Sequence, residues 1–130
     1  MFAGKSSAPS RRGLGFWLFC GLVAAAGCGG ADTRPAKWSF IAPAIIEPTC
    51  ATASCHSEVA KRAGVVLAPK DAAFHTLVDR QFVRPMDAAE SEMVILMRGI
   101  GSQRMPPDYP LAEADIELIE KWIDDGAMPD

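Results

Sequence analysis

The sequence predicts a small all-α domain of short helices and long loops. No stretch shows the alternation of apolar and polar residues that a half-buried strand needs. Apolar residues recur instead at helical spacing, and prolines and glycines divide these segments into short pieces. Long loops are unusual in a domain of this size unless a central group helps to fill the core.

Residues 1–27 have the pattern of a secretory signal peptide. Lys5, Arg11 and Arg12 precede an apolar run at residues 13–26, which is shorter than the roughly 20 residues that a membrane span needs. We therefore exclude this segment from the predicted fold.

The end of the apolar run, Ala25-Ala26-Gly27-Cys28, resembles a bacterial lipobox. Lipidation would make Cys28 the first residue of the mature chain and anchor it to a bacterial membrane, facing the periplasm or the exterior. The alternative is a plain signal peptide, which leaves Cys28 as a free thiol in an oxidising compartment. Residues 28–37 are small, polar or proline, and they predict a lipidated N-terminus with a flexible tether.

The charge of the remaining chain limits its partners. Removing residues 1–27 takes away three cations and no acid, so the formal net charge of −3 falls to −6. This balance excludes a basic surface for nucleic acid or for anionic lipid headgroups. The chain also lacks a carboxylate pair or a nucleophile with its base, so hydrolysis is not expected.

We expect one domain at residues 38–130, which begins with helical turns. Apolar residues recur at roughly helical spacing between Trp38 and Cys50, but Pro43 and Pro48 interrupt them. Pro43 fits a first helical turn, and Pro48 is expected to end regular helix before it. The next apolar piece, residues 65–67, is short, extended and closed by a proline.

Three further helices follow. The first is expected at residues 70–78, and the second at residues 92–98 with Ser91 as its N-cap and residues 99–101 as its stop. Residues 104–110 are too rich in proline for a helix and predict a rigid loop. The last helix, at residues 113–125, has the clearest pattern, with four core positions and a glycine stop: Ile116, Ile119, Trp122, Ile123 and Gly126.

Four residues carry the chemistry of the chain. Cys50 and Cys55 are separated by four residues, His56 follows directly, and Met105 stands before a proline pair. Two thiols, an imidazole and a thioether are the parts needed to attach a haem covalently and to close both axial positions of its iron. A local disulfide between the two cysteines is the alternative, in a haem-free envelope lipoprotein with a binding or structural role. A structural zinc site is not expected, because it wants four ligands.

In their order and spacing these residues resemble the small c-type cytochrome-like domains of exported bacterial lipoproteins. Such domains carry a cysteine-histidine motif after the first helix, a Met-Pro-Pro loop downstream and a closing helix with Trp-Ile near Gly-Ala. The chain matches at Cys55-His56, at residues 105–107, at residues 122–123 and at residues 126–127. The resemblance covers about residues 40–128, and the haem motif is a C-x4-C-H variant.

The resemblance implies one haem c in the centre of a cytochrome c-like fold. It implies thioether bonds from Cys50 and Cys55, His56 as the proximal ligand and Met105 as the distal ligand. A spacer of four residues needs a bulged loop if both thiols are to reach the ring. The alternative distal ligands are His75 and Met86, and Met86 follows Pro85.

The function implied is that of an electron carrier and not an enzyme. With both axial positions closed, the protein would pass single electrons between redox partner proteins outside the cytoplasm. If Met105 does not bind the iron, the open position makes weak peroxidase activity conceivable.

Overall fold

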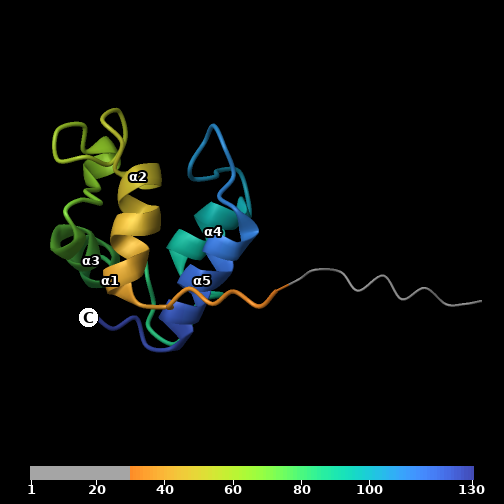
Figure 1. Ribbon diagram of the computed structural model, residues 1–130. Helices are drawn as coiled ribbons and strands as arrows, with labels where there is room; N and C mark the ends of the chain where they lie inside the picture. The colour runs from red at the N-terminus through yellow and green to blue at the C-terminus, as the bar shows by residue number, and fades with distance from the viewer. Residues whose placement is uncertain (1–29) are drawn as a thin grey trace, which may run out of the picture. The chain divides into compact units, whose positions relative to one another are not determined.

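The structure is a computed structural model that describes residues 30–130. Helices are the only regular secondary structure in this range, which confirms the all-α prediction. The helices are connected by long loops, and residues 51–69 and 99–112 project from the same end of the fold (Figure 1). The predicted signal peptide and Cys28 lie outside the described residues.

The first helical column is longer than the sequence predicts. Helix α1 (Trp38–Ile41), the π-helical segment η1 (Ala42–Ile46) and helix α2 (Glu47–Cys50) follow one another without a break (Figure 1). The prediction that Pro48 ends the helix is therefore wrong.

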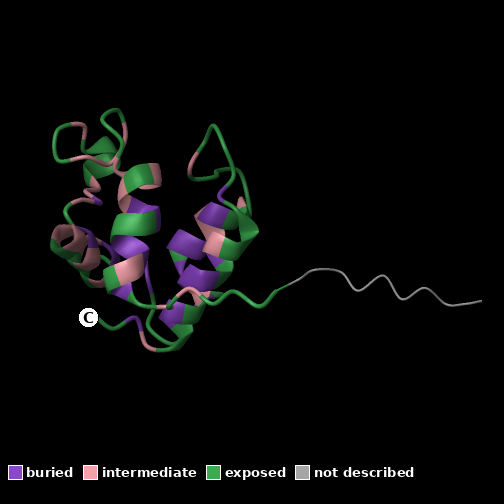
Figure 2. Cartoon of the chain, in the orientation of Figure 1, coloured by how far each residue is buried: buried purple, intermediate pink, exposed green. Residues whose placement is uncertain are grey.

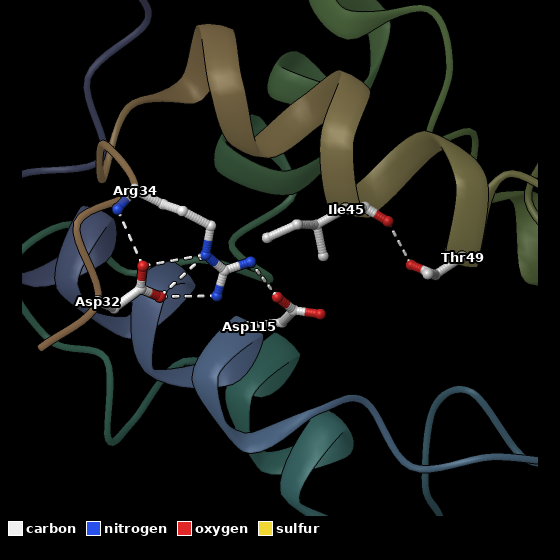
Figure 3. Close-up of polar contacts among 5 residues, drawn as sticks. All are labelled: Asp32, Arg34, Ile45, Thr49 and Asp115. Atoms are coloured by element: carbon white, nitrogen blue, oxygen red, sulfur yellow. Dashed lines mark hydrogen bonds and ion pairs between the residues drawn. The ribbon is translucent and has the colours of Figure 1, made fainter. Parts of the chain in front are cut away.

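The wider π-turn accommodates the two prolines of this column. A proline lacks the N–H that an α-helix needs in its interior, and π-turns interrupt an α-helix without ending it. The N–H of Glu47 bonds to the carbonyl of Ala42, and the N–H of Ala51 bonds to that of Ile46, each five residues back. The Thr49 hydroxyl also donates to the carbonyl of Ile45 (Figure 3). Helix α2 thus delivers Cys50 at its last position.

The remaining helices agree closely with the predicted ones. They are α3 (Lys70–Asp79), α4 (Glu92–Arg98) and α5 (Glu113–Asp124), and a short 3-10 turn, η2 (Arg62–Gly64), precedes α3. Helix α4 ends as predicted at Gly99, which has φ of 66° in the left-handed region that glycine adopts without strain. No helix among residues 30–130 has the length and apolar character to cross a membrane.

An aromatic cluster joins the helices at the core. The rings of Trp38 and Trp122 are stacked with centroids 4.8 Å apart, and Phe74 meets both rings edge-on. The indole N–H groups donate to the carbonyls of Lys70 and Met128, so both tryptophans are buried with their polar atoms bonded. Buried residues run along α1, η1, α4 and α5 (Figure 2).

Ion pairs tie other parts of the chain to α5. Arg98 of α4 bonds to Glu113 at 2.8 Å and to Glu120 at 2.5 Å. Arg34 bonds to Asp32 and reaches Asp115 at 2.5 Å (Figure 3). Arg34 lies in the segment 28–37 that composition predicts as a tether. Its bond to Asp115 on α5 shows that contacts with the folded domain begin within this segment.

Ser91 occupies the predicted N-cap position, but its side chain has a different role. The hydroxyl does not bond to the first turn of α4. It is fully buried, donates to the carbonyl of Asp87 at 2.8 Å and accepts from the N–H of Arg84 at 2.9 Å. Ser91 thus holds the loop before α4 in place, which the local cap pattern does not reveal.

We predict that Ser91→Ala lowers the free energy of unfolding by about 1–3 kcal/mol, because it removes a fully buried hydroxyl and leaves the part-buried N–H of Arg84 without its partner. Urea unfolding of the purified protein measures the change. Ser102→Ala is the control, since Ser102 is exposed in a loop and its loss should cost less than about 0.5 kcal/mol. Equal effects of the two substitutions would show that the buried hydroxyl contributes nothing.

Candidate functional site

A cavity of about 590 Å³ brings the chemistry-bearing residues together. Its lining comes from residues 49–82 and from residues 92–107, and Figure 1 shows the elements of these two stretches on either side of the fold. Most lining side chains are apolar. The volume lies within the roughly 300–1,000 Å³ that is usual for small-molecule and cofactor sites. All four residues predicted as haem ligands or attachment points line it: Cys50, Cys55, His56, Met105.

The spacer between the cysteines forms a closed loop. The N–H of His56 donates to the carbonyl of Cys50 at 3.1 Å, and the N–H of Cys55 donates to that of Thr52 at 3.0 Å. These bonds bend the chain back, so that both thiols reach the same cavity in spite of the four intervening residues. Among residues 30–130, Cys50 and Cys55 are free thiols.

The two thiols have different electrostatic environments. Burial raises the pKa of the Cys50 thiol, although Thr49 offsets this in part through a hydrogen bond. Hydrogen bonds from Thr52 and Ser54 lower the pKa of the Cys55 thiol. Cys55 is therefore the more readily ionised and the more nucleophilic of the pair.

His56 is fixed by its backbone and by its ring. Its carbonyl accepts from the N–H of Leu67 at 2.8 Å, and its Nδ1 lies 3.3 Å from the carbonyl oxygen of Val65. A carbonyl oxygen only accepts, so Nδ1 is the nitrogen that carries the proton. The lone pair of a neutral ring is then on Nε2, the arrangement that a metal-binding histidine needs.

The turn before Val65 is held from two directions. The N–H of Arg62 donates to the carbonyl of Cys55 at 3.0 Å, and Nη1 of Arg80 donates to the carbonyl of Gly64 at 2.8 Å. Ala63 and Gly64 have positive φ, which turns the chain sharply at the edge of the cavity. The same turn therefore sets the position of the Val65 carbonyl and of Arg62.

Met105 reaches the cavity from the proline-rich loop. Its N–H donates to the carbonyl of Leu96 at 3.0 Å, which ties the loop to the end of α4. The side chain is 38% exposed and lines the cavity together with Pro106 and Pro107. The thioether and the His56 imidazole thus come from the two different stretches that line the site.

The two alternative distal ligands lie elsewhere. Met86 is 77% exposed and does not line the cavity. His75 bonds to Asp79 on the surface of α3 and also lies outside the cavity. Met93 and Met97, which the sequence assigns to packing or to the helix surface, are buried and face the cavity from α4.

Sequence reasoning missed several residues of the site. The Val65 carbonyl has no signature in the sequence, because any residue supplies a backbone oxygen. Arg62, Arg80 and Glu92 also line the cavity, and no local pattern marks them as neighbours. The two arginines carry one usable signal, since they are cations in a domain with an excess of acids.

A family model described as Planctomycete cytochrome C matches residues 53–109. The match contains Cys55, His56 and Met105 but begins after Cys50, and it covers less than half of the chain. Comparison with curated proteins and with solved structures gives no match. The family match supports a cytochrome c-like domain of the kind that carries haem and transfers electrons.

Proposed function

We propose that the chain is a membrane-anchored c-type cytochrome with one haem, which carries single electrons outside the cytoplasm. The observation that carries this proposal is the single cavity that Cys50, Cys55, His56 and Met105 line together. The sequence motif selects these residues without reference to their positions in space. Their convergence is therefore independent support for a shared ligand.

The donor groups fit a covalently attached haem. The cavity is apolar enough for a porphyrin ring, and it offers two free thiols for thioether bonds. His56 has an orienting bond at Nδ1 and a free Nε2, and Met105 supplies a soft sulfur ligand. A haem bound here would supply a one-electron couple, and a histidine-methionine pair raises its reduction potential.

The residues of the protein would hold the haem and shield it. The backbone bonds of His56 and Met105 fix both ligands before binding, which lowers the entropy lost when the site fills. Buried apolar side chains such as Leu67 and Met97 line the interior of the cavity and would shield a bound ring from water. This arrangement suits electron transfer, in which the ligands keep their places in both oxidation states.

The location and partners of the protein belong to the same proposal. The signal-peptide pattern of residues 1–27 supports export, and the lipobox-like sequence at Cys28 supports a lipid anchor. A carrier held at a membrane surface would exchange electrons with redox proteins of the same compartment. The acidic charge of the mature chain disfavours nucleic acid as a partner.

We predict that the protein, made in a host that matures c-type cytochromes, has a Soret band that survives denaturation and acid extraction. Cys50→Ala should keep covalent haem through Cys55, which is directly beside His56, and the double substitution of both cysteines should lose it. Absorption spectra of denatured protein measure the attachment.

Folded but colourless protein would overturn the proposal. A count of free thiols then separates the remaining readings, because the haem-free alternative expects Cys50 and Cys55 to be joined in a disulfide. In the described residues both cysteines are free, so the structure does not contain that disulfide.

We predict that Met105→Ala removes the weak near-infrared band of a sulfur-iron bond and lowers the midpoint potential, since methionine ligation raises it. Met86→Ala is the matched control, because Met86 is exposed outside the cavity and should leave both properties unchanged. If the band persists without Met105, the ligand is another sulfur, and Met93 and Met97 are the ones that line the cavity.

We predict that Cys28→Ala moves the protein from the membrane fraction to the soluble fraction of the envelope, because the acyl chains supply its attachment. Fractionation with a haem stain measures this. Ser102→Ala, a change in an exposed loop of the domain, should leave the distribution unchanged. Retention of the Cys28 variant in the membrane would place the anchor elsewhere.

A further inference from the structure

Three large apolar side chains project into solvent from the two long loops. Val59 in residues 51–69 is 92% exposed, and Ile100 and Tyr109 in residues 99–112 are 60% and 78% exposed. Both loops project from the same end of the fold (Figure 1), and we call their outward side the loop face. A single exposed apolar side chain needs no explanation, but several at one end of a small domain are typical of a binding surface.

The cavity opens on the loop face. Its lining combines buried residues such as Leu67 and Met97 with exposed ones, and exposed lining residues mark the mouth of a cavity. Most of the exposed ones belong to the two loops: Arg62, Ala63, Gln103, Met105 and Pro107. A haem held in the cavity would therefore come nearest to solvent between the loops. The rate of electron transfer falls steeply with distance, so this end is the one from which a partner can exchange electrons.

The loop face also differs in charge from the rest of the domain. The two loops contain three cations and two acids: Lys61, Arg62, Arg104, Glu58 and Asp108. The other residues between 30 and 130 contain seven cations and fourteen acids, so their formal net charge is −7 against +1 for the loops. Even with both carboxylates of a haem counted among them, the loops remain far less acidic than the rest. An acidic protein is therefore repelled least at the loop face.

Two cations of the loop face lie beside its apolar side chains and have no acidic partner. Lys61 is two residues from Val59, in a turn that its carbonyl closes by accepting from the N–H of Gly64 at 2.7 Å. The side chain of Arg104 packs against Gly99, where an added Cβ would lie 3.2 Å from its Cδ. None of the salt bridges among residues 30–130 involves either loop.

We propose that the loop face docks an acidic redox protein, whose apolar centre contacts Val59, Ile100 and Tyr109 and whose acidic rim faces Lys61 and Arg104. The proposal rests on the proposed function and adds to it the surface and the chemistry of the partner. In the docked pair one electron passes from the ferrous haem, which becomes ferric, to the oxidised centre of the partner, and no bond is made or broken. The apolar contacts supply affinity, and the charges orient the encounter.

The test uses the mature haem protein and two blue copper proteins as one-electron acceptors, one acidic and one basic at neutral pH. Stopped-flow absorption measures the second-order rate constant for oxidation of the ferrous haem. We expect the acidic acceptor to react faster, because the basic acceptor is drawn to the acidic remainder of the domain, away from the cavity mouth. Faster reaction with the basic acceptor would place the docking site elsewhere and overturn the proposal.

Removal of single charges locates the surface. Lys61→Gln and Arg104→Gln each take one positive charge from the loop face, and Arg84→Gln takes one from an exposed arginine outside it. We expect the rate constant with the acidic acceptor to fall about two- to fivefold in the first two variants at low ionic strength and to stay unchanged in the third. Equal effects of the three substitutions would show that only net charge matters, and would overturn the proposal.

Removal of apolar area tests the centre of the surface. Val59→Ser and Tyr109→Ser should each lower the same rate constant by about tenfold at high ionic strength, where charge steering is screened. Met86→Ala is the matched control, because it shortens an exposed apolar side chain outside the loops. Unchanged rate constants in the Val59 and Tyr109 variants would contradict an apolar docking centre.

A membrane is the other surface that exposed apolar side chains and cations suit. Vesicles with anionic phospholipid test it with the Cys28→Ala form, which would lack acyl chains, and we expect no binding. Vesicle binding that Val59→Ser and Lys61→Gln abolish, together with unchanged electron-transfer rates in these variants, would assign the loop face to the membrane and overturn the proposal. Protein without covalent haem would instead refute the proposed function.

Discussion

The hydrogen bonds of His56 are the interactions on which the site depends. Its N–H closes the cysteine loop on Cys50, its carbonyl accepts from Leu67, and its Nδ1 bonds to the carbonyl of Val65. Each bond alone contributes about 1 kcal/mol. Together they fix the imidazole relative to α2 and to the extended piece after η2. Loss of these bonds would therefore leave the two thiols and the imidazole without fixed relative positions.

The packed core and the cavity are built from different residues, which explains how so small a domain can hold a large cavity. The aromatic cluster of Trp38, Phe74 and Trp122 joins α1, α3 and α5 in a packed core of its own. The cavity is built from other residues, mainly from α2, α4 and the two long loops. A small domain gains limited stability from its apolar core, so a bound ring that buries side chains such as Leu96 and Phe82 would add to it.

The sequence predicts the parts of the fold that local patterns determine. Helix α4 has the predicted bounds and α5 ends within one residue of them, since helical periodicity and a glycine stop are local signals. The π-segment at residues 42–46 escapes prediction, because a proline is normally evidence that a helix ends. Ser91 has the sequence of a cap and the contacts of a buried hydroxyl, and only tertiary structure distinguishes the two roles.

The residues of the candidate site also fall into those that the sequence predicts and those that only the structure reveals. Cys50, Cys55, His56 and Met105 can be selected from the sequence, because haem attachment requires unusual side chains in a particular order. Val65 cannot be selected, since its contribution is a backbone oxygen brought close by a turn with positive φ at residues 63–64. Arg62 and Arg80 are far apart in sequence, and the bond between Arg80 and Gly64 is what brings them to one edge.

The ion pairs of the domain neutralise acids on α5 but do not involve the arginines that line the cavity. Three acids of α5 are paired within the domain, Asp115 with Arg34 and Glu113 and Glu120 with Arg98, and Asp125 directly after the helix pairs with Lys121. Exposed pairs of this kind contribute little to stability, but they do neutralise the helix locally. The arginines of the cavity have no such partners, although the domain has carboxylates in excess. Arg62 and Arg80 are exposed, so water solvates these charges, and the edge of the cavity keeps a positive charge that the acids of the domain do not neutralise.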